Sequence, residues 1–438
     1  MNSAFEQTDI GLIPEDWAND TIGNHFDIKQ GKQLSKLTRV GNNQKKFLRT
    51  ANVFWGTLDL SELDEMNFTK EEEEKLKLRY NDLLVCEGGD IGRTAIWRND
   101  LEDCYYQNHI HRLRLKKETI SPLFFMNWMY YGVVLANKYF GIGNRTTIPN
   151  LSASRLKSFQ FPLPPLSEQK KIAHILSKIQ FTIETQEQII KTTQELKKAL
   201  MQKLFTKGLN GEPQKMTEIG LIPESWEVIK LEATGDVVYG IQASVAHLTK
   251  PIGLPILTNK NITFDGIIDL SELNYFELRT KRHFDTILKK GDILFNWRSG
   301  SIAHVGKTAY FDLDGEYVHS SFILRIRPKE NINNKYLFYF LTHLRLSDYF
   351  IKLHSYSINA KFNKSAVNKL PTVIPSPREQ LSITNYLSNI DNKIILAETI
   401  LINKKNLFTS LLNNLMTGQV RVKDVEFEIE ESLEGINA

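Results

Sequence analysis

The side chains best suited to chemistry in this sequence are amides, guanidinium groups, lysines and aromatic rings in loops rich in Gly and Asn. Amide and guanidinium groups match the donors and acceptors on base edges, while Lys and Arg neutralise phosphates. The candidates in the first half are Gln30, Lys32, Arg49, Asn52, Arg93, Asn144 and Arg145. Those in the second half are Tyr239, Gln242, Asn259, Lys260, Asn261, Arg298, Ser299, Lys307 and Tyr356. As a set they predict nucleic-acid binding, although each one alone could equally be a turn former or a surface polar residue.

A segment similar to a phosphate-binding loop ends in Gly306-Lys307-Thr308. That loop needs a glycine five positions before its Gly-Lys-Thr, yet Ser301 occupies this position and Gly300 comes one residue too early. The residues that follow, 309–311, favour a strand where a helix should begin. The sequence therefore predicts a β-turn here and no nucleotide site.

Other catalytic and metal-binding sets were sought and are not supported. His109 and His111 would share one face of a strand downstream of Cys104, but no fourth ligand is evident, so a surface or core histidine pair is the preferred interpretation. An adenine methyltransferase would need an Asn/Asp-Pro-Pro-aromatic loop, and neither Asn-Pro-Pro nor Asp-Pro-Pro occurs. The run of glutamates at 71–74 is interpreted as a solvated helix face. We predict no catalytic residue, metal or cofactor in this chain.

The composition indicates an ordinary globular protein of several domains. Its 438 residues are 41% hydrophobic and 24% charged, and about 100–200 residues per domain allow two to four domains. The first residues lack a signal-peptide pattern, and Cys86 and Cys104 form no CxxC motif, so we expect a reducing, cytoplasmic location. The net charge of +4 does not by itself indicate a nucleic-acid partner, but an acidic tail after Val422 leaves the body more basic.

The elements that must position the candidate residues occur twice. The segment Thr8–Trp17 returns 209 residues later as Thr217–Trp226, and Pro164–Gln169 returns as Pro375–Gln380. A repeat of this length is a duplicated domain, since solenoid units run to about 20–50 residues. Two similar units suit a partner with near two-fold symmetry, such as duplex DNA.

Each half contains the repeated opening motif, a globular stretch rich in β-branched and aromatic residues, and a long helix. Residues 292–295, 307–311 and 322–327 read as strands, and 124–131 and 336–346 as aromatic helices. We expect an α+β fold, with a twisted and mostly antiparallel sheet in each half.

The long helices carry apolar residues at alternating spacings of four and three, which indicate the heptad seam of a coiled coil. Ser167 is a suitable N-cap for the first helix, and Glu168 places negative charge in its first turn. The predicted interface residues are Ile172, Leu176, Ile179, Ile183, Ile190, Leu200, Leu204, Ile383, Leu387, Ile390, Ile394, Ala397, Leu401, Phe408, Leu411 and Leu415. Polar residues interrupt both seams: Gln186, Thr193 and Lys197 in the first helix, and Lys404 in the second.

Neither apolar stripe can face water alone, so we expect the two helices to pack against each other. If the globular parts lie at opposite ends, the helices run antiparallel and form a rod of about 60 Å. The alternative is two separate helix-capped domains on a string.

The ordered set of motifs, occurring twice, resembles the specificity subunits of type I restriction–modification systems. The likeness rests on the doubled Gly-x-Ile-Pro-x-x-Trp, on Leu163–Gln169 before a long helix, and on the Gly291–Phe295 and Gly306–Ala309 hairpin. It extends from about Ile10 to Val422. The implied parts are target-recognition domains at 1–166 and 217–378, coiled-coil helices at 167–207 and 379–421, a linker at 208–216 and an acidic tail at 422–438.

The resemblance implies two target-recognition domains separated by an antiparallel two-helix coiled coil. Each domain would read one half of a bipartite, asymmetric site in double-stranded DNA, and the helices would set the unread spacer. The implied partners are two methyltransferase subunits and the restriction–translocase subunits, which would bind S-adenosylmethionine, ATP and Mg. The holoenzyme would be a site-specific deoxyribonuclease and adenine-N6 methyltransferase, while this chain would be non-catalytic.

Two departures from the family pattern bear on specificity. The second half has Pro375-Ser376-Pro377-Arg378 where Leu-Pro-Pro-Leu is more usual, and residues 87–90 differ from 296–301, so we expect two different half-sites. The alternative functions are a stand-alone nuclease or modification enzyme and a coiled-coil adaptor that binds only proteins.

Overall fold

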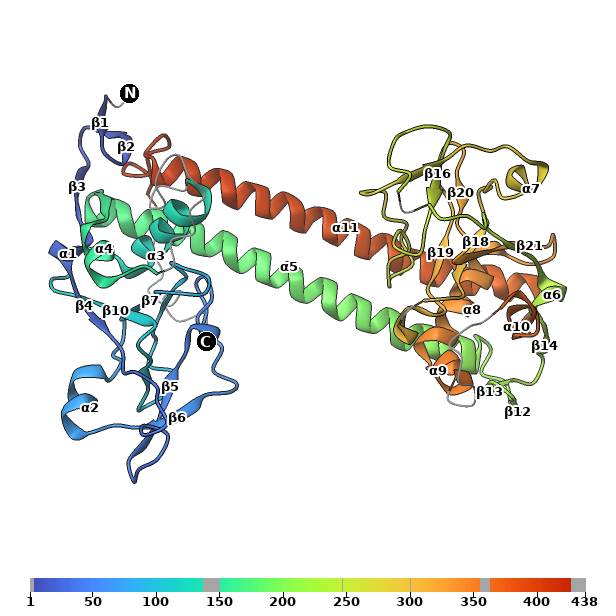
Figure 1. The fold of residues 1–438 in the computed structure, drawn as a ribbon, viewed down its shortest axis with the longest axis horizontal. Coiled ribbons are helices and arrows are strands. Elements are labelled where there is room, and N and C mark those ends of the chain that lie inside the picture. The colour runs from blue at the N-terminus through green and yellow to red at the C-terminus, as the bar shows by residue number, and fades with distance from the viewer. Residues whose placement is uncertain (1–3, 137–149, 246, 300, 355–362, 427–438) are drawn as a thin grey trace. The chain divides into compact units, whose positions relative to one another are not determined.

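The computed structural model describes residues 4–136, 150–245, 247–299, 301–354 and 363–426 (Figure 1). The chain divides into two compact units: unit 1 comprises residues 1–187 and 400–438, and unit 2 comprises residues 188–399. Each unit therefore contains one globular part together with portions of both long helices. The sequence-based boundaries assigned each long helix to a segment of its own, whereas residues of each long helix belong to both units.

Unit 1 is built around a four-stranded antiparallel sheet in the order β4-β10-β7-β8. A smaller sheet, β6-β5-β9, includes the parallel pair β5–β9. Its strands are β1 Phe5–Thr8, β2 Gly11–Pro14, β3 Ala18–Thr21, β4 Phe26–Gln30, β5 Gln44–Leu48, β6 Asp64–Asn67, β7 Leu83–Cys86, β8 Thr94–Ile96, β9 Tyr105–Tyr106, β10 Ile110–Leu115 and β11 Gln160–Leu163. Its shorter helices are α1 Ile22–His25, α2 Lys70–Leu76, α3 Pro122–Tyr130 and α4 Ala153–Ser158, with a π-helical turn at Tyr131–Leu135.

Unit 2 repeats this plan with the sheet β15-β21-β18-β19 and the smaller sheet β17-β16-β20. Its strands are β12 Gln214–Thr217, β13 Gly220–Pro223, β14 Glu227–Lys230, β15 Gly235–Tyr239, β16 Leu254–Leu257, β17 Asn274–Phe276, β18 Ile293–Asn296, β19 Thr308–Tyr310, β20 Val318–His319, β21 Ile323–Pro328 and β22 Pro371–Ile374. Its helices are α6 Leu231–Thr234, α7 Lys281–Phe284, α8 Asn334–Leu346, α9 Tyr349–His354 and α10 Lys364–Asn368. The predicted α+β class, strands and aromatic helices are confirmed.

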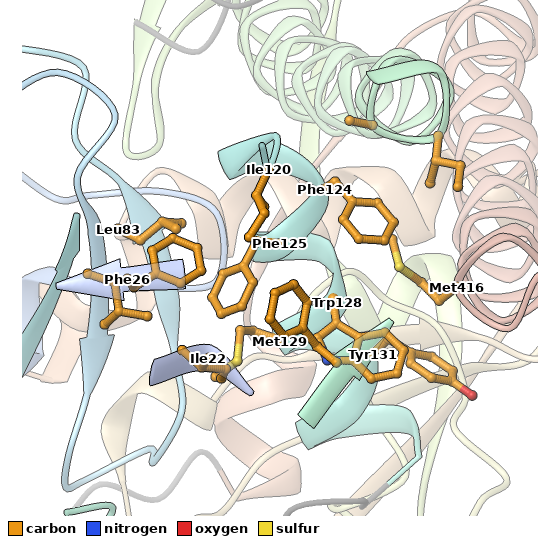
Figure 2. Packing of buried hydrophobic residues seen from close by; sticks show 14 of the residues in the cluster. Ile22, Phe26, Leu83, Ile120, Phe124, Phe125, Trp128, Met129, Tyr131 and Met416 are labelled. Carbon is orange, nitrogen blue, oxygen red and sulfur yellow. The ribbon is translucent and has the colours of Figure 1, made fainter. Parts of the chain in front are cut away.

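The core of unit 1 joins its sheet to the long helices through α3 (Figure 2). Phe26 on β4 packs against Phe125 on α3, with ring centroids 4.6 Å apart. Phe124 and Met416, from α3 and the end of the last helix, belong to the same cluster and are fully buried. In unit 2, the aromatic helix α8 contributes Tyr336 and Phe340 to the equivalent core.

The two long helices are α5 Leu166–Lys207 and α11 Pro377–Met416. All of the predicted interface residues are buried or half-buried. The helix α11 ends at Met416, although the sequence predicted continuation to 421. Gly418 adopts a positive φ of 68°, the left-handed conformation typical of a helix C-terminus, and this stops the helix.

Within each unit, the segments of α5 and α11 run antiparallel. In unit 1, Lys405 pairs with Glu187, whereas Arg421, just past the end of α11, pairs with Glu168 near the start of α5. In unit 2, Lys197 pairs with Asp391 at 2.5 Å. Three of the polar interruptions of the seams therefore have partners on the facing helix, and Lys404 Nζ donates to Gln186 Oε1 at 3.1 Å. Thr193 instead donates to the Ile189 carbonyl of its own helix.

Candidate nucleic-acid interface

Three strand ends meet at one edge of the main sheet in unit 1. The strand β4 ends at Gln30, which pairs with His111, and β7 ends at Cys86, which pairs with Ile110 at the start of β10. Gln30 and the residues next to these ends, Glu87 and His109, therefore share one edge. Gln30 Nε2 donates to Glu87 Oε2 at 2.7 Å, and His109 Nδ1 lies 4.0 Å from the same oxygen.

The same edge of unit 2 carries aromatic side chains. Tyr239 ends β15, Trp297 follows β18, and Phe322 precedes β21. The rings of Tyr239 and Trp297 pack edge to face with centroids 5.4 Å apart, and the guanidinium of Arg298 lies 5.5 Å from the centre of the Phe322 ring. Trp297 Nε1 donates to the carbonyl of Ser321 at 2.8 Å.

Several other predicted residues lie at the surface near this edge or on adjacent loops. Arg93 is half-buried, forms an ion pair with Asp90 and lies over the Phe54 ring. Arg49 pairs with Asp64 at 3.2 Å, with both side chains substantially exposed. In unit 2, the exposed residues are Gln242, Lys260 and Arg298, while Asn259 and Ser299 are half-buried.

The structure gives Asn52 and Asn261 a role other than the predicted contact with nucleic acid. Both side chains are buried. The Asn52 amide accepts from the backbone of Arg49 and donates to two carbonyls, and Asn261 repeats these bonds with Thr258 and two carbonyls of its own loop. Because every bond is local, these amides hold a duplicated turn.

Two predicted lysines are also engaged within the protein. Lys307 Nζ donates to the carbonyls of Asn259 and Ile262. Burial, and secondarily the charge of Arg345, lower the pKa of Lys307. Lys32 Nζ donates to Glu72 and to the carbonyl of Asn67. Both ammonium groups therefore hydrogen-bond to acceptors within the protein.

Asn144, Arg145 and Tyr356 lie outside the described residues. The edge residues Glu87, His109, Trp297 and Phe322 were not among the predicted contacts. Aligning the two halves at the ends of β7 and β18 would have placed them, because the repeated registers put Glu87 and Trp297 in one position.

The structure also describes the segments that were considered for nucleotide and metal binding. Residues 302–304 form a single 3₁₀ turn, and the strand β19 follows it, as predicted for the phosphate-loop lookalike. His111 is buried, with Nε2 2.7 Å from the carbonyl of Leu151. Burial raises the pKa of the Cys86 and Cys104 thiols to about 12. In the part of the chain that the structure describes, no group of three or more His, Cys, Asp or Glu could hold a metal ion.

The long helices present apolar surface as well as the packed seam. Exposed side chains on unit 1 segments include Phe181, Ile402 and Leu407, and those on unit 2 segments include Leu196 and Leu396. Among the described helices, none has the length and hydropathy needed to cross a bilayer.

Each unit also has a groove between its globular part and the helices, at equivalent positions. The groove of unit 2 measures about 480 Å³ and is lined by Phe264, Phe338 and Ile394 among others. That of unit 1 measures about 440 Å³ and includes Trp55 and Met126. Both grooves combine apolar side chains with charged ones, such as Lys197 and Asp391 in unit 2 and Glu187 and Lys405 in unit 1.

Comparison with known proteins supports the duplicated architecture. A family model described as the type I restriction modification DNA specificity domain matches the chain twice, at residues 14–195 and 223–404. The specificity subunit of the type I restriction enzyme MjaVIII from Methanocaldococcus jannaschii is 26% identical over 424 residues, which cover 95% of each chain. The EcoBI specificity subunit from Escherichia coli is 26% identical over 208 residues, covering 46% of this chain and 43% of that one.

Solved structures share the fold. A chain from a structure concerned with complex assembly and conformational transition of the type I R-M system has a TM-score of 0.61 at 16% identity, covering 93% of this chain and 99% of that chain. The S subunit from M. genitalium has a TM-score of 0.54 at 16% identity, covering 91% and 96%. The two family matches together span well over half of the sequence. Each begins within one copy of the repeated opening motif and includes one copy of the motif that precedes a long helix. The chain therefore belongs to the family of type I restriction modification DNA specificity domains, of which it carries two copies.

Proposed function

We propose that this chain is the DNA-specificity subunit of a type I restriction–modification complex, and that each unit reads one half of a bipartite, asymmetric site. The observation that carries this proposal is the contrast between the two units at one position of a shared scaffold. The three strand ends carry Gln30, Glu87 and His109 in unit 1 and three aromatic residues in unit 2. A framework shared by the two units, with unlike side chains at the same strand ends, is suited to the recognition of two different sequences.

The helices α5 and α11 have two roles in this proposal. Their length sets the number of unread base pairs between the half-sites, and their exposed apolar residues and the two grooves receive methyltransferase subunits. Because the groove occurs once in each unit, the expected stoichiometry is two methyltransferase subunits per chain. Methylation of adenine, with S-adenosylmethionine, and cleavage, with ATP and Mg, would be supplied by the methyltransferase and restriction–translocase subunits.

The test is a binding measurement on the chain purified together with the methyltransferase encoded beside it. A duplex pool with randomised positions is bound, recovered and sequenced at several salt concentrations. We expect enrichment of two short, unlike sequences at a fixed separation, with affinity that falls steeply as salt rises because phosphate contacts release counterions. Nucleic-acid turnover by the chain alone would favour a stand-alone enzyme, and the absence of any DNA binding would favour a protein-only adaptor.

A second experiment tests the helices as a spacer. Deleting residues 188–194 of α5 together with 394–400 of α11 removes one heptad from each helix. It leaves the Lys404–Gln186 and Lys197–Asp391 contacts in the remaining sequence. We expect the separation between the half-sites to shorten while both sequences stay the same. An unchanged separation would contradict the spacer role.

A further inference from the structure

We propose that Glu87 is a specificity-determining residue of unit 1, and that it selects a base with an exocyclic amino group, cytosine or adenine. This inference rests on the proposed function, because it specifies how one unit reads its half-site. It concerns a residue at the sheet edge, together with its positioning partner Gln30.

The position of Glu87 is defined by the duplicated register. Cys86 pairs with Ile110 in unit 1, and Asn296 pairs with Ile323 in unit 2. The residues that follow Cys86 and Asn296, Glu87 and Trp297, therefore occupy one topological position. The backbone there is tied down, since the Glu87 N–H donates to the His109 carbonyl and the Glu87 carbonyl accepts from Leu151 N–H. The same rigid point thus presents a carboxylate in one unit and an indole in the other.

The chemistry of Glu87 is unusual for a surface that binds DNA. Among the described residues, no Lys or Arg lies within ion-pair distance of its carboxylate. Its side chain is only 12% exposed, and Gln30 Nε2 holds Oε2 at 2.7 Å. A carboxylate in this setting repels phosphates, so it is compatible with bound DNA only where a hydrogen-bond donor faces it.

The donors on the base edges of the major groove are the amino groups of cytosine and adenine. Guanine presents only acceptors there, and thymine presents an acceptor and a methyl group. Opposite either of these bases, the partly buried carboxylate would gain no donor beyond Gln30 Nε2 and would face a base acceptor or a methyl group, which is costly. Glu87 therefore disfavours guanine and thymine and also favours cytosine or adenine through a hydrogen bond. Gln30, which is exposed, positions the carboxylate and keeps its own amide oxygen available.

Unit 2 offers a different surface at the same point. Trp297 has its only donor engaged by the Ser321 carbonyl, and the Tyr239 hydroxyl accepts from Lys364 N–H at 2.8 Å. At this position, unit 2 therefore presents mainly the faces of aromatic rings, with the guanidinium of Arg298 over the neighbouring Phe322 ring. Selection of an amino group by a carboxylate is therefore expected in unit 1 alone. A substitution of Glu87 should alter the base preference at one half-site only.

The test uses the complex of the full chain with its methyltransferase and a pool of duplexes randomised across both half-sites. Glu87→Gln keeps the shape of the side chain but adds a donor. We expect discrimination at one base position to fall about 10-fold or more, so that a guanine or thymine becomes accepted there. The half-site of unit 2 should be unchanged. Glu74→Gln, at an exposed glutamate of α2, is the matched control and should leave both half-sites intact.

Gln30→Ala provides a second, independent variant. It keeps the carboxylate but removes its positioning bond, and we expect partial loss of discrimination at the same base position. An unchanged preference with both variants, or equal changes in both half-sites, would overturn the inference and leave the proposed function standing. If the wild-type complex showed no sequence preference, the proposed function and this inference would both fall.

Discussion

The indole Nε1 of Trp17 donates a hydrogen bond to Glu168 Oε2 at 3.1 Å, and Trp226 makes the same bond to Glu379 at 3.0 Å. These bonds join the two motifs that recur in the sequence, although 151 residues separate Trp17 from Glu168. The neighbouring glutamine has a repeated role as well. Gln169 accepts from the backbone N–H of Ser121, the N-cap of α3, and Gln380 accepts from Asn333, the N-cap of α8. The recurring motifs are therefore the joints between each globular part and its long helix.

The first prediction concerns the joint in unit 2. Glu379→Ala leaves the buried Trp226 Nε1 and the N–H of Leu209 without their carboxylate partner. We expect the free energy of unfolding to fall by about 2–4 kcal/mol, because buried donors are costly to leave unpaired. The measurement is the thermal unfolding midpoint. Glu224→Ala, at an exposed residue of the same motif, should change stability by less than about 0.5 kcal/mol. Equal effects of the two substitutions would contradict a structural role for the joint.

The second prediction concerns pH and Arg421 in unit 1. The hydrogen bond from Arg421 is the main cause that lowers the pKa of Asp16 to about 2. Burial would raise the pKa of Glu168, but hydrogen bonds from Arg421 and Trp17 outweigh it and lower that pKa. Carboxylates with a lowered pKa stabilise the folded state above their unfolded pKa of about 4, and lose that contribution as the pH falls through the folded pKa.

The stability difference between the wild type and Arg421→Met should therefore be constant above about pH 5 and shrink between about pH 4 and pH 2. Thermal unfolding across this range measures it. Lys423→Met, which removes a half-exposed partner 3.4 Å from Asp16, serves as the control and should have a small effect. A difference that grows on acidification would be inconsistent with this assignment.

The third prediction concerns the duplicated turn amides. Asn261→Asp replaces the NH₂ group that donates to the carbonyls of Asp269 and Glu272 with an oxygen. We expect the free energy of unfolding to fall by about 2–3 kcal/mol, since two buried carbonyls then face a carboxylate. Asn259→Ala is the neighbouring control, because no side-chain hydrogen bond of Asn259 is found among the described residues. If Asn261→Asp changed DNA preference without lowering the unfolding midpoint, a direct contact with DNA would be the better explanation.

The fourth prediction concerns the connection between α8 and the long helices. Tyr339 OH donates to Asp391 Oδ2 at 2.6 Å, and Lys197 pairs with the other oxygen of Asp391. Tyr339→Phe should lower the free energy of unfolding by about 1.5–3 kcal/mol, which is the range for a hydrogen bond to a charged group. Tyr386→Phe removes a hydroxyl from a side chain that is 54% exposed, so it should leave the unfolding midpoint unchanged. Indistinguishable midpoints for the two variants would contradict the prediction.

The fifth prediction concerns Arg298, which is exposed above the Phe322 ring. Arg298→Ala should weaken binding or relax base choice at one half-site only, by about 1–3 kcal/mol if it contacts a base. Selection from the randomised duplex pool measures both half-sites at once. An equal change at both half-sites would contradict the assignment of one reading unit to each.

Local patterns were sufficient for the repeat, the α+β class and both long helices. Helix periodicity is a property of neighbouring residues, so the seam from Ile172 to Leu204 could be read directly, and its members are buried or half-buried. The strands at 293–296 and 308–310 were recognised for the same reason, because β-branched and aromatic runs stand between Gly-rich turns.

The tertiary structure decided which polar residues are free to bind a partner. Asn261 and Arg298 are both polar loop residues in the sequence. The Asn261 amide is buried and hydrogen-bonds to backbone carbonyls of its own turn, whereas Arg298 is exposed. Only the strand register brings Gln30, Glu87 and His109 to one edge. The close approach of Pro14 to Gly418, just past the end of α11, is likewise a contact between distant segments, since a side chain at Gly418 would collide with Pro14. Such outcomes depend on which groups meet across the fold, and contacts between residues far apart in the chain leave no periodic signal in its sequence.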